Sequence, residues 1–170
     1  GYFSPSDQTN SSTSNKMDLM YLDAYPAIFY QNSYRIDAVL STTAHEFQHL
    51  VHYHYDKTEE LWVNEGLSEL AGTYCGYGLN FPNLYLQETN QSLIRWGGEV
   101  KDYSRVNLWT LYCAEQLGLS FIKNLTQNPS HGITGFNESV TNSGNTGNLN
   151  FYFSNWVLAN FINDSDIDPG

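Results

Sequence analysis

The chain has 170 residues, of which 41% are hydrophobic and 15% aromatic, so it can bury the core of one domain. Its 18 acidic residues outweigh 7 basic ones, and the net charge of -11 disfavours nucleic acids and anionic membrane surfaces as partners. No apolar run reaches membrane-spanning length, and no signal peptide is found. A cationic or neutral peptide or protein is the favoured partner, and the oligomeric state is open.

The cellular setting is indicated only by composition. The chain begins at Gly1 without an initiating Met, so we expect a piece of a longer protein. A sequence rich in Asn, Ser, Thr and Tyr and poor in Lys favours a secreted or cell-surface protein. Cys75 and Cys113 form no Cys-x-x-Cys pattern. They pair if the chain is exported, and two buried free thiols are the alternative.

The N-terminal segments differ in pattern. Residues 1–16 are expected to form a loop-rich lead-in, because the stretch from Ser4 to Asn15 is dense in Ser, Thr, Asn and Asp. Residues 17–25 alternate apolar and polar side chains before Pro26, which predicts a strand at a sheet edge. From residue 35 to 55, apolar or small residues recur at spacings of three and four, which predicts a helix.

The remainder of the chain is predicted to be mainly helical. A polar connector at 56–60 leads to a second helix at 61–74, which Gly76, Gly78 and Pro82 bring to an end. Further helices are predicted at 83–95, at 104–117 before Gly118, at 120–125 and at 151–162, followed by an acidic tail at 163–170. The Gly- and Asn-rich stretch 131–150 is expected to be a loop with one or two helical turns.

The first predicted helix carries the run His45-Glu46-Phe47-Gln48-His49, an H-E-x-x-H pattern. Residues four apart lie on one face of a helix, so the rings of His45 and His49 can converge on one metal ion. Glu46, next to the first ring, is then placed to act on a water molecule as a general base. The pattern indicates zinc hydrolysis, although alone it also occurs by chance.

A catalytic zinc site usually has three protein ligands, and the second predicted helix offers the third. Its sequence W-V-N-E-G-L-S-E places Glu65 and Glu69 four residues apart, hence on one face. One carboxylate can bind the ion while the other accepts a hydrogen bond from a ligand imidazole and fixes its tautomer. The spacing leaves open which glutamate has which part.

H-E-x-x-H followed by W-V-N-E-G resembles the gluzincin metallopeptidases. With D-Y-S-R-V-N-L-W-T-L-Y-C-A-E-Q-L-G and N-W-V-L-A-N-F, the chain from about Met17 onward is most similar to bacterial hyicolysin-like peptidases. The resemblance implies an α+β, zincin-like metallopeptidase catalytic domain, mostly helical with a small sheet at the N-terminal side. Residues 1–170 would be this single domain or a fragment of a longer protein, with the sheet edge and zinc-binding helices at 17–75 and a helical C-terminal part at 76–170.

The resemblance also implies roles for individual residues. His45, His49 and Glu65 would bind Zn²⁺, Glu46 would be the general base, and Glu69 would be the hydrogen-bond partner of His45. The spacing from His49 to Glu65 is shorter than in thermolysin-like and aminopeptidase-like gluzincins. Glu69 fits the longer spacing by count and is the alternative third ligand.

The group that stabilises the oxyanion of peptide hydrolysis is expected to be Tyr103. It precedes a helical run, as a catalytic tyrosine does in aminopeptidase-like gluzincins. The alternatives are Arg105, His131 and Tyr74.

Several conspicuous side chains are expected to have structural parts only. His52 and His54 would cap or pack around the end of the first helix, because a catalytic zinc needs no fourth protein ligand. Glu69 could also be a solvated carboxylate, and Tyr103 an ordinary half-buried tyrosine. The tryptophans at 62, 109 and 156 are expected in the core or a groove wall, and Trp96 at an exposed loop.

Zinc-dependent hydrolysis of peptide bonds is the predicted function. The aminopeptidase-type G-x-M-E-N motif is absent from the sequence, which favours an endopeptidase. A zincin-like metal-binding or adhesion module of a surface protein, without turnover, is the alternative. The intact Glu46 argues against this alternative, because a binding module has no need of a base.

Overall fold

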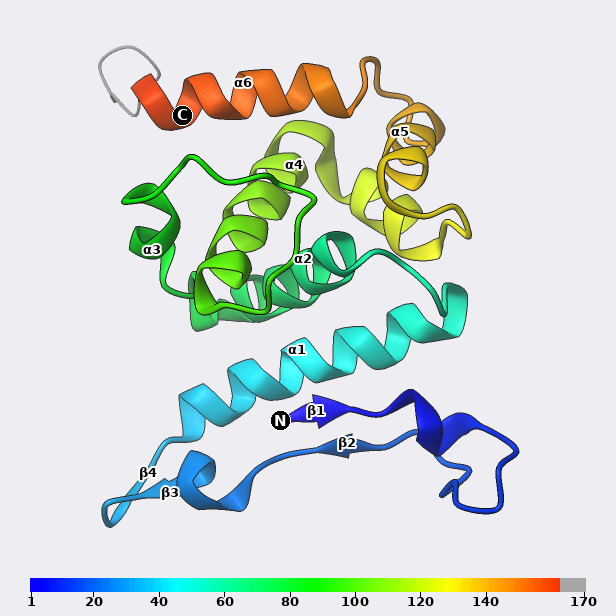
Figure 1. The fold of residues 1–170 in the computed structure, drawn as a ribbon, viewed down its shortest axis with the longest axis vertical. Helices are drawn as coiled ribbons and strands as arrows, with labels where there is room; N and C mark the ends of the chain where they lie inside the picture. Colours follow the sequence, from blue (N-terminus) through cyan, green and yellow to red (C-terminus); the bar gives the residue numbers. More distant parts are fainter. Residues whose placement is uncertain (163–170) are drawn as a thin grey trace.

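The computed structural model describes residues 1–162 and is mostly helical, with two small two-stranded sheets near the N-terminus (Figure 1). The strands are β1 (Tyr2–Phe3), β2 (Met20–Tyr21), β3 (Phe29–Tyr30) and β4 (Ser33–Tyr34). The helices are α1 (Ile36–Tyr55), α2 (Leu61–Gly72), α3 (Pro82–Leu86), α4 (Val100–Gln127), α5 (Gly132–Asn142) and α6 (Leu149–Ile162). This agrees with the predicted α+β class; the predicted acidic tail lies outside the described residues. Within 1–162, none of the helices combines the length and apolar character needed to cross a membrane.

The N-terminal sheet is shorter than the sequence predicts. β1 pairs antiparallel with β2, and the rings of Tyr2 and Tyr21 stack with centroids 4.5 Å apart. The strand predicted over 17–25 is wrong beyond Met20–Tyr21, because the Asp23 side chain accepts a hydrogen bond from the Tyr25 backbone N–H and begins a helical turn. Asx caps of this kind compete with extended structure.

A hairpin of β3 and β4 precedes α1. Its turn residues Gln31 and Asn32 have φ values of 47° and 62°. Two consecutive left-handed residues are typical of the tight turn that joins twisted antiparallel strands. The hairpin sets the direction in which the chain enters α1.

Helices α1 and α2 confirm the helices predicted at 35–55 and 61–74. Figure 1 shows α1 between the N-terminal strands and α2, with α4 on the other side of α2. The contact between α2 and α4 is close at Gly66, where a Cβ atom would meet Thr110 Oγ1. A side chain at 66 would require the Thr110 hydroxyl or the helix to shift, so Gly66 permits the close approach of α2 to α4.

The segment after α3 corrects the helix predicted at 83–95, which is confined to Pro82–Leu86. The buried Arg105 explains this, because its guanidinium donates hydrogen bonds to Gln91 Oε1 and to the Arg95 backbone carbonyl. These bonds hold residues after α3 as a loop across α4. Long-range contacts of this type override local helix propensity.

Helix α4 begins earlier than predicted and contains the predicted break. Glu99 and Asp102 form a capping box, which starts the helix at Val100. Gly118 interrupts it with φ 78° and ψ 171°. The two helices predicted on either side of Gly118 are therefore confirmed as two segments of α4 that meet at this break.

The loop predicted at 131–150 is wrong, because residues 132–142 form α5. Phe136 and Val140 lie four apart on α5 and are buried, and the Phe136 ring packs 5.0 Å from the ring of Phe121. Burial of this apolar pair stabilises a helix whose Gly and Asn content disfavours it.

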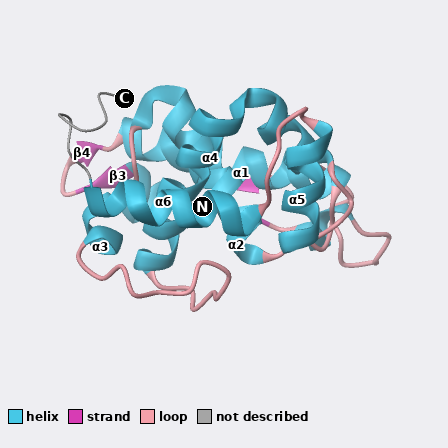
Figure 2. Cartoon of the chain, turned by 90° about the horizontal axis from the view of Figure 1, so that it is seen from above, coloured by secondary structure: helices cyan, strands magenta, loops and turns pink. Residues whose placement is uncertain are grey.

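The core lies among α2, α4, α5 and α6, which Figure 2 shows as seen from above. The predicted burial of three tryptophans is confirmed for Trp62, Trp109 and Trp156. Trp96 is partly buried against this core rather than exposed, because its ring meets the edge of Tyr103 at 5.0 Å. The packing of Trp96 against Tyr103 therefore fixes the position of the Tyr103 ring.

Candidate metal centre

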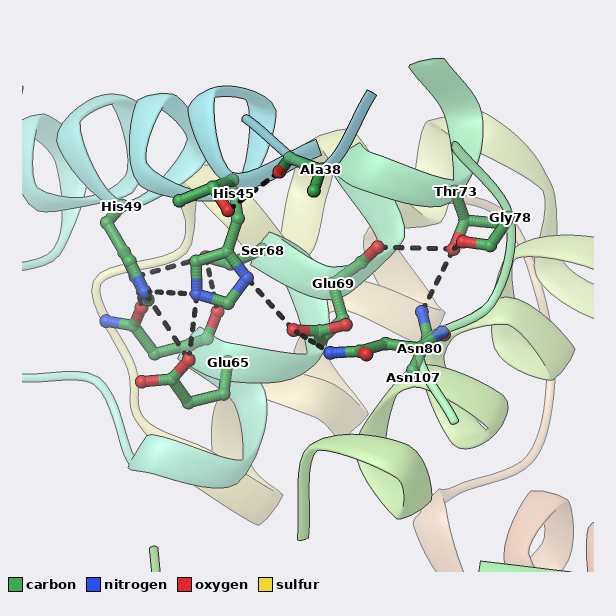
Figure 3. A network of polar contacts seen from close by, with 12 residues as sticks. Ala38, His45, His49, Glu65, Ser68, Glu69, Thr73, Gly78, Asn80 and Asn107 are labelled. Atoms are coloured by element: carbon green, nitrogen blue, oxygen red, sulfur yellow. Dashed lines mark hydrogen bonds and ion pairs between the residues drawn. The ribbon is translucent and has the colours of Figure 1, made fainter. Parts of the chain in front are cut away.

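Two imidazoles and one carboxylate converge between α1 and α2 (Figure 3). His45 Nε2 and His49 Nε2 lie 3.0 Å apart. Glu65 Oε2 lies 3.2 Å from His45 Nε2 and 3.4 Å from His49 Nε2. The helical spacing of the histidines and the antiparallel packing of α2 therefore bring three ligand atoms to one point.

The separations of these atoms fit a tetrahedral metal site. Zinc lies about 2.0–2.1 Å from imidazole nitrogen, so two ligand atoms of a tetrahedral site are about 3.3 Å apart. The three separations of 3.0, 3.2 and 3.4 Å bracket this value. The side chains are 13–16% exposed, so the group is accessible without being open to bulk water on all sides.

The outer nitrogens of both imidazoles have partners on α2. His45 Nδ1 lies 3.1 Å from Glu69 Oε1, the contact expected for a residue that orients His45. His49 Nδ1 contacts Asn64 Oδ1, and the Ser68 hydroxyl lies 3.0 Å away. Asn64 and Ser68 were not predicted. Each directly precedes one of the two predicted glutamates, so Asn64 and Ser68 are also four residues apart.

Glu65 and Glu69 differ in what they reach. Glu65 Oε2 approaches the Nε2 atoms of both histidines, whereas Glu69 approaches only the opposite side of the His45 ring. Within residues 1–162, Glu65 is the carboxylate that groups with His45 and His49 as a potential metal site.

Electrostatics in the metal-free chain favour a positive charge at this point. Burial lowers the pKa of His45, but the Glu65 and Glu69 carboxylates outweigh it and raise the pKa to about 9. Burial raises the pKa of Glu65, but His45 and His49 hold it at about 2. A proton on His45 therefore balances the carboxylates, and a bound cation would take the place of that proton.

A cavity of about 520 Å³ opens beside His45, one of the three potential ligands. His45, Glu46, Glu69 and Tyr103 line it, and Glu46 is buried. The apolar side chains of Leu79, Phe81 and Val100 also face it. The cavity thus combines potential ligands, a buried carboxylate and an apolar wall.

Tyr103 is the one of the four oxyanion candidates that lines this cavity. Its ring centroid lies 6.3 Å from that of His45. Burial and the nearby Glu65, Glu69 and Glu46 carboxylates raise its pKa, so the phenol stays protonated and can donate. The candidates Arg105, His131 and Tyr74 are absent from the lining.

A polar network also contacts Glu69, in part through the same carboxylate oxygen that lies near His45 (Figure 3). Asn80 Nδ2 donates to Glu69 Oε1 over 3.4 Å, and the Asn80 backbone N–H donates to Asn107 Oδ1. Asn107 Nδ2 donates to the Thr73 hydroxyl, which in turn donates to the Glu69 carbonyl. The network joins α4 to the carboxylate that contacts His45, so it argues against a merely solvated Glu69.

The remaining predicted residues lie away from this centre. His52 is fully buried at the end of α1, as expected for packing, whereas His54 is exposed and makes only a ring contact with Tyr55. The two cysteines are free, with Cys75 exposed and Cys113 buried, so they do not form a disulfide.

Comparison with known proteins points to the same class of chemistry. No protein-family model matches the chain. The chain is similar to a neutral metalloprotease, ShpI of Staphylococcus hyicus, with 27% identity over 150 residues. The match covers 77% of this chain and 34% of that relative, so the chain spans about a third of the length of the curated protein it matches. The similarity relates the chain distantly to a metalloprotease.

Proposed function

We propose that the chain is a zincin-like catalytic domain of a zinc metallopeptidase, a gluzincin most like the hyicolysin-like peptidases. The observation that carries the proposal is the triangle of His45 Nε2, His49 Nε2 and Glu65 Oε2 beside a cavity that also holds Glu46. These three side chains would bind Zn²⁺ and leave a position open toward the cavity. The similarity to a neutral metalloprotease supports the proposal.

The chemistry divides among the residues of the cavity. When bound, zinc lowers the pKa of water and polarises a peptide carbonyl. Glu46 accepts the proton of the attacking water and delivers it to the leaving amine. The phenolic O–H of Tyr103 donates a hydrogen bond to the developing oxyanion. The raised pKa of Tyr103 keeps the phenol protonated for this role.

The partners of the imidazoles keep both rings in the binding tautomer. Glu69 accepts from His45 Nδ1, and Asn64 accepts from His49 Nδ1. Each Nε2 is thereby left with a free lone pair directed at the site. The hydrogen bonds that Asn80, Asn107 and Thr73 make around Glu69 keep this arrangement rigid.

We further propose that residues 1–170 form one catalytic unit of a secreted or cell-surface endopeptidase. The ligands come from the segment 17–75, and the segment 76–170 supplies Tyr103 and the opposite wall of the cavity. Peptides or proteins are the proposed substrates. The apolar wall of Leu79, Phe81 and Val100 supports binding of an apolar side chain next to the cleaved bond.

The test is cleavage of a quenched-fluorescent peptide library by the purified chain. We expect cleavage that a chelator abolishes and that added Zn²⁺ restores. Internal cleavage of peptides blocked at both ends would identify an endopeptidase. Zinc binding without chelator-sensitive cleavage would overturn the proposal and support a metal-binding or adhesion module without turnover.

A further inference from the structure

A second group of ligand-type side chains lies where α1 ends and the connector to α2 begins. His52, Asp56 and Glu59 each offer one ligand atom, and these atoms lie within 4.8 Å of one another. The three residues are 0%, 5% and 8% exposed. None of them belongs to the cavity described above.

Atoms of this group lack hydrogen-bond partners although they are buried. His52 Nδ1 and His52 Nε2 have none, and neither has Glu59 Oε2. Buried polar atoms in folded proteins are nearly always satisfied by protein, water or an ion. An imidazole whose two nitrogens are both unsatisfied, beside an unsatisfied carboxylate oxygen, indicates that another species completes the group.

Both oxygens of Asp56 and the second oxygen of Glu59 have hydrogen-bond partners. His131 Nδ1 lies 2.8 Å from Asp56 Oδ2, and the Thr58 backbone N–H donates to Asp56 Oδ1. Glu59 Oε1 accepts from the Gly132 backbone N–H over 2.7 Å. Hydrogen bonds of this kind orient carboxylates that bind metals. Two of these donors, His131 and Gly132, lie at the start of α5, which therefore contacts the group from a distant part of the sequence.

We propose that His52, Asp56 and Glu59 bind a divalent transition-metal ion at a structural site separate from the catalytic centre. Two carboxylates and one neutral imidazole match a dication in charge. The imidazole favours Zn²⁺ over Ca²⁺, Mg²⁺ and Mn²⁺, which prefer oxygen ligands. Burial of all three residues excludes substrate, and closed sites of this kind are structural.

The site joins two parts of the chain that are distant in sequence. It links the last turn of α1, the connector and the start of α5, which lie on the same side of the molecule in Figure 1. The connector determines how α2 presents Glu65 to the histidines of α1. An ion at the second site would therefore stabilise the arrangement of the first without taking part in its chemistry.

The test is a count of bound metal in the unmodified chain and in matched variants. The chain is stripped with a chelator and titrated with Zn²⁺, and separately with Mn²⁺, and bound metal is measured after gel filtration. We expect two equivalents of Zn²⁺ in the unmodified chain and one in Glu59→Gln, which keeps the Oε1 acceptor but loses a ligand charge. His54→Ala, an exposed change on the same helical turn, should keep two.

The outcomes separate the two sites. His45→Ala should also bind one equivalent, and Zn²⁺ should raise its unfolding temperature, an increase that is lost when Glu59→Gln is added. If Glu59→Gln binds as much Zn²⁺ as the unmodified chain, whether one equivalent or two, the second site does not exist. If instead His45→Ala keeps two equivalents, the proposed catalytic site fails and the second site is unaffected.

Crystals of the unmodified chain grown with Zn²⁺ provide a measurement that does not depend on variants. An anomalous peak among His52, Asp56 and Glu59 is expected at the zinc edge. Density without an anomalous peak would show a buried water in that position and overturn the proposal.

Discussion

The two groups of ligand-type residues, one within α1 and one at its end, form a natural comparison. His45, His49 and His52 follow one another at spacings of four and three, so they lie along one face of α1. Asp56 comes four residues after His52 and lies just beyond the helix, at its C-cap. Each pair is completed by a glutamate that follows α1, Glu65 in one case and Glu59 in the other. The chain thus places two similar sets of ligand-type side chains along α1 and at its end.

The surroundings of the two groups differ. The first borders a cavity of about 520 Å³ that also contains Glu46, whereas the second is buried and meets the start of α5. Both imidazoles of the first group have their outer nitrogens bonded, but His52 has no partner for either nitrogen. Access to a cavity, rather than residue type or spacing, is what distinguishes the proposed catalytic site from the proposed structural site.

The largest expected effect comes from a pair of isosteric changes, one at Glu46 beside the first group and one at Glu59 in the second group. Glu46→Gln should lower turnover by about 10²–10⁴-fold, because the amide cannot accept a proton. Its zinc content and unfolding temperature should match those of the unmodified chain. Glu59→Gln should retain most of the turnover while losing metal-dependent stability. Peptide cleavage and thermal unfolding measure both, and equal losses of turnover would remove the distinction between the groups.

The second prediction concerns Tyr103, which lines the cavity beside the first group. Tyr103→Phe removes the phenolic donor and keeps the ring that packs on Trp96. We expect kcat to fall by about 10²–10³-fold with little change in KM, as for loss of one oxyanion donor. Tyr74→Phe is the control, since Tyr74 does not line the cavity. Equal kcat values for both variants would assign Tyr103 a packing role.

The third difference concerns the two glutamates of α2. Glu65→Ala should abolish zinc binding at the first group, whereas Glu69→Ala should weaken it by about 10–100-fold, as for the loss of a hydrogen-bond partner of a ligand. Competition titration with a zinc indicator measures both, in the Glu59→Gln background so that only the first group is observed. Loss of binding confined to Glu69→Ala would exchange the two assignments.

The smallest expected effect is on stability in acid. It serves as a control because it does not depend on a bound metal. Burial raises the pKa of Asp102, but the backbone N–H groups of Glu99 and Gly97 and the Arg105 guanidinium outweigh it, so the pKa lies below its usual value. A carboxylate with a lowered pKa in the folded state stabilises the chain above about pH 4, and this stability is lost as the pH falls further. Acid unfolding of Asp102→Asn should therefore show a shallower pH dependence, with or without Zn²⁺. A change that depends on Zn²⁺ would connect Asp102 to a metal group.

The sequence predicts α1 and α2 well because their apolar spacing and their burial agree. It could not predict α5, since the burial of Phe136 and Val140 depends on the distant Phe121. The loop held by Arg105 was missed for the same reason.

The candidate site shows the same limit. The residues that converge on one point follow from helical spacing, as His45, His49 and Glu65 do. Whether a histidine faces a cavity or a buried pair of carboxylates depends on tertiary packing, so His52 could only be interpreted as a packing residue. Asn64 and Ser68 carried a spacing signal, but neither residue type by itself indicates a contact with an imidazole.

The contact at Gly66 ties the position of Glu65 to the packing between α2 and α4. Gly66 lies beside Glu65, and α2 lies between α1 and α4. A side chain at 66 would meet the Thr110 hydroxyl, so either that hydroxyl or α2 would have to move. Glu65, whose carboxylate approaches both histidines, is thus also the neighbour of a glycine whose missing side chain lets α2 approach α4.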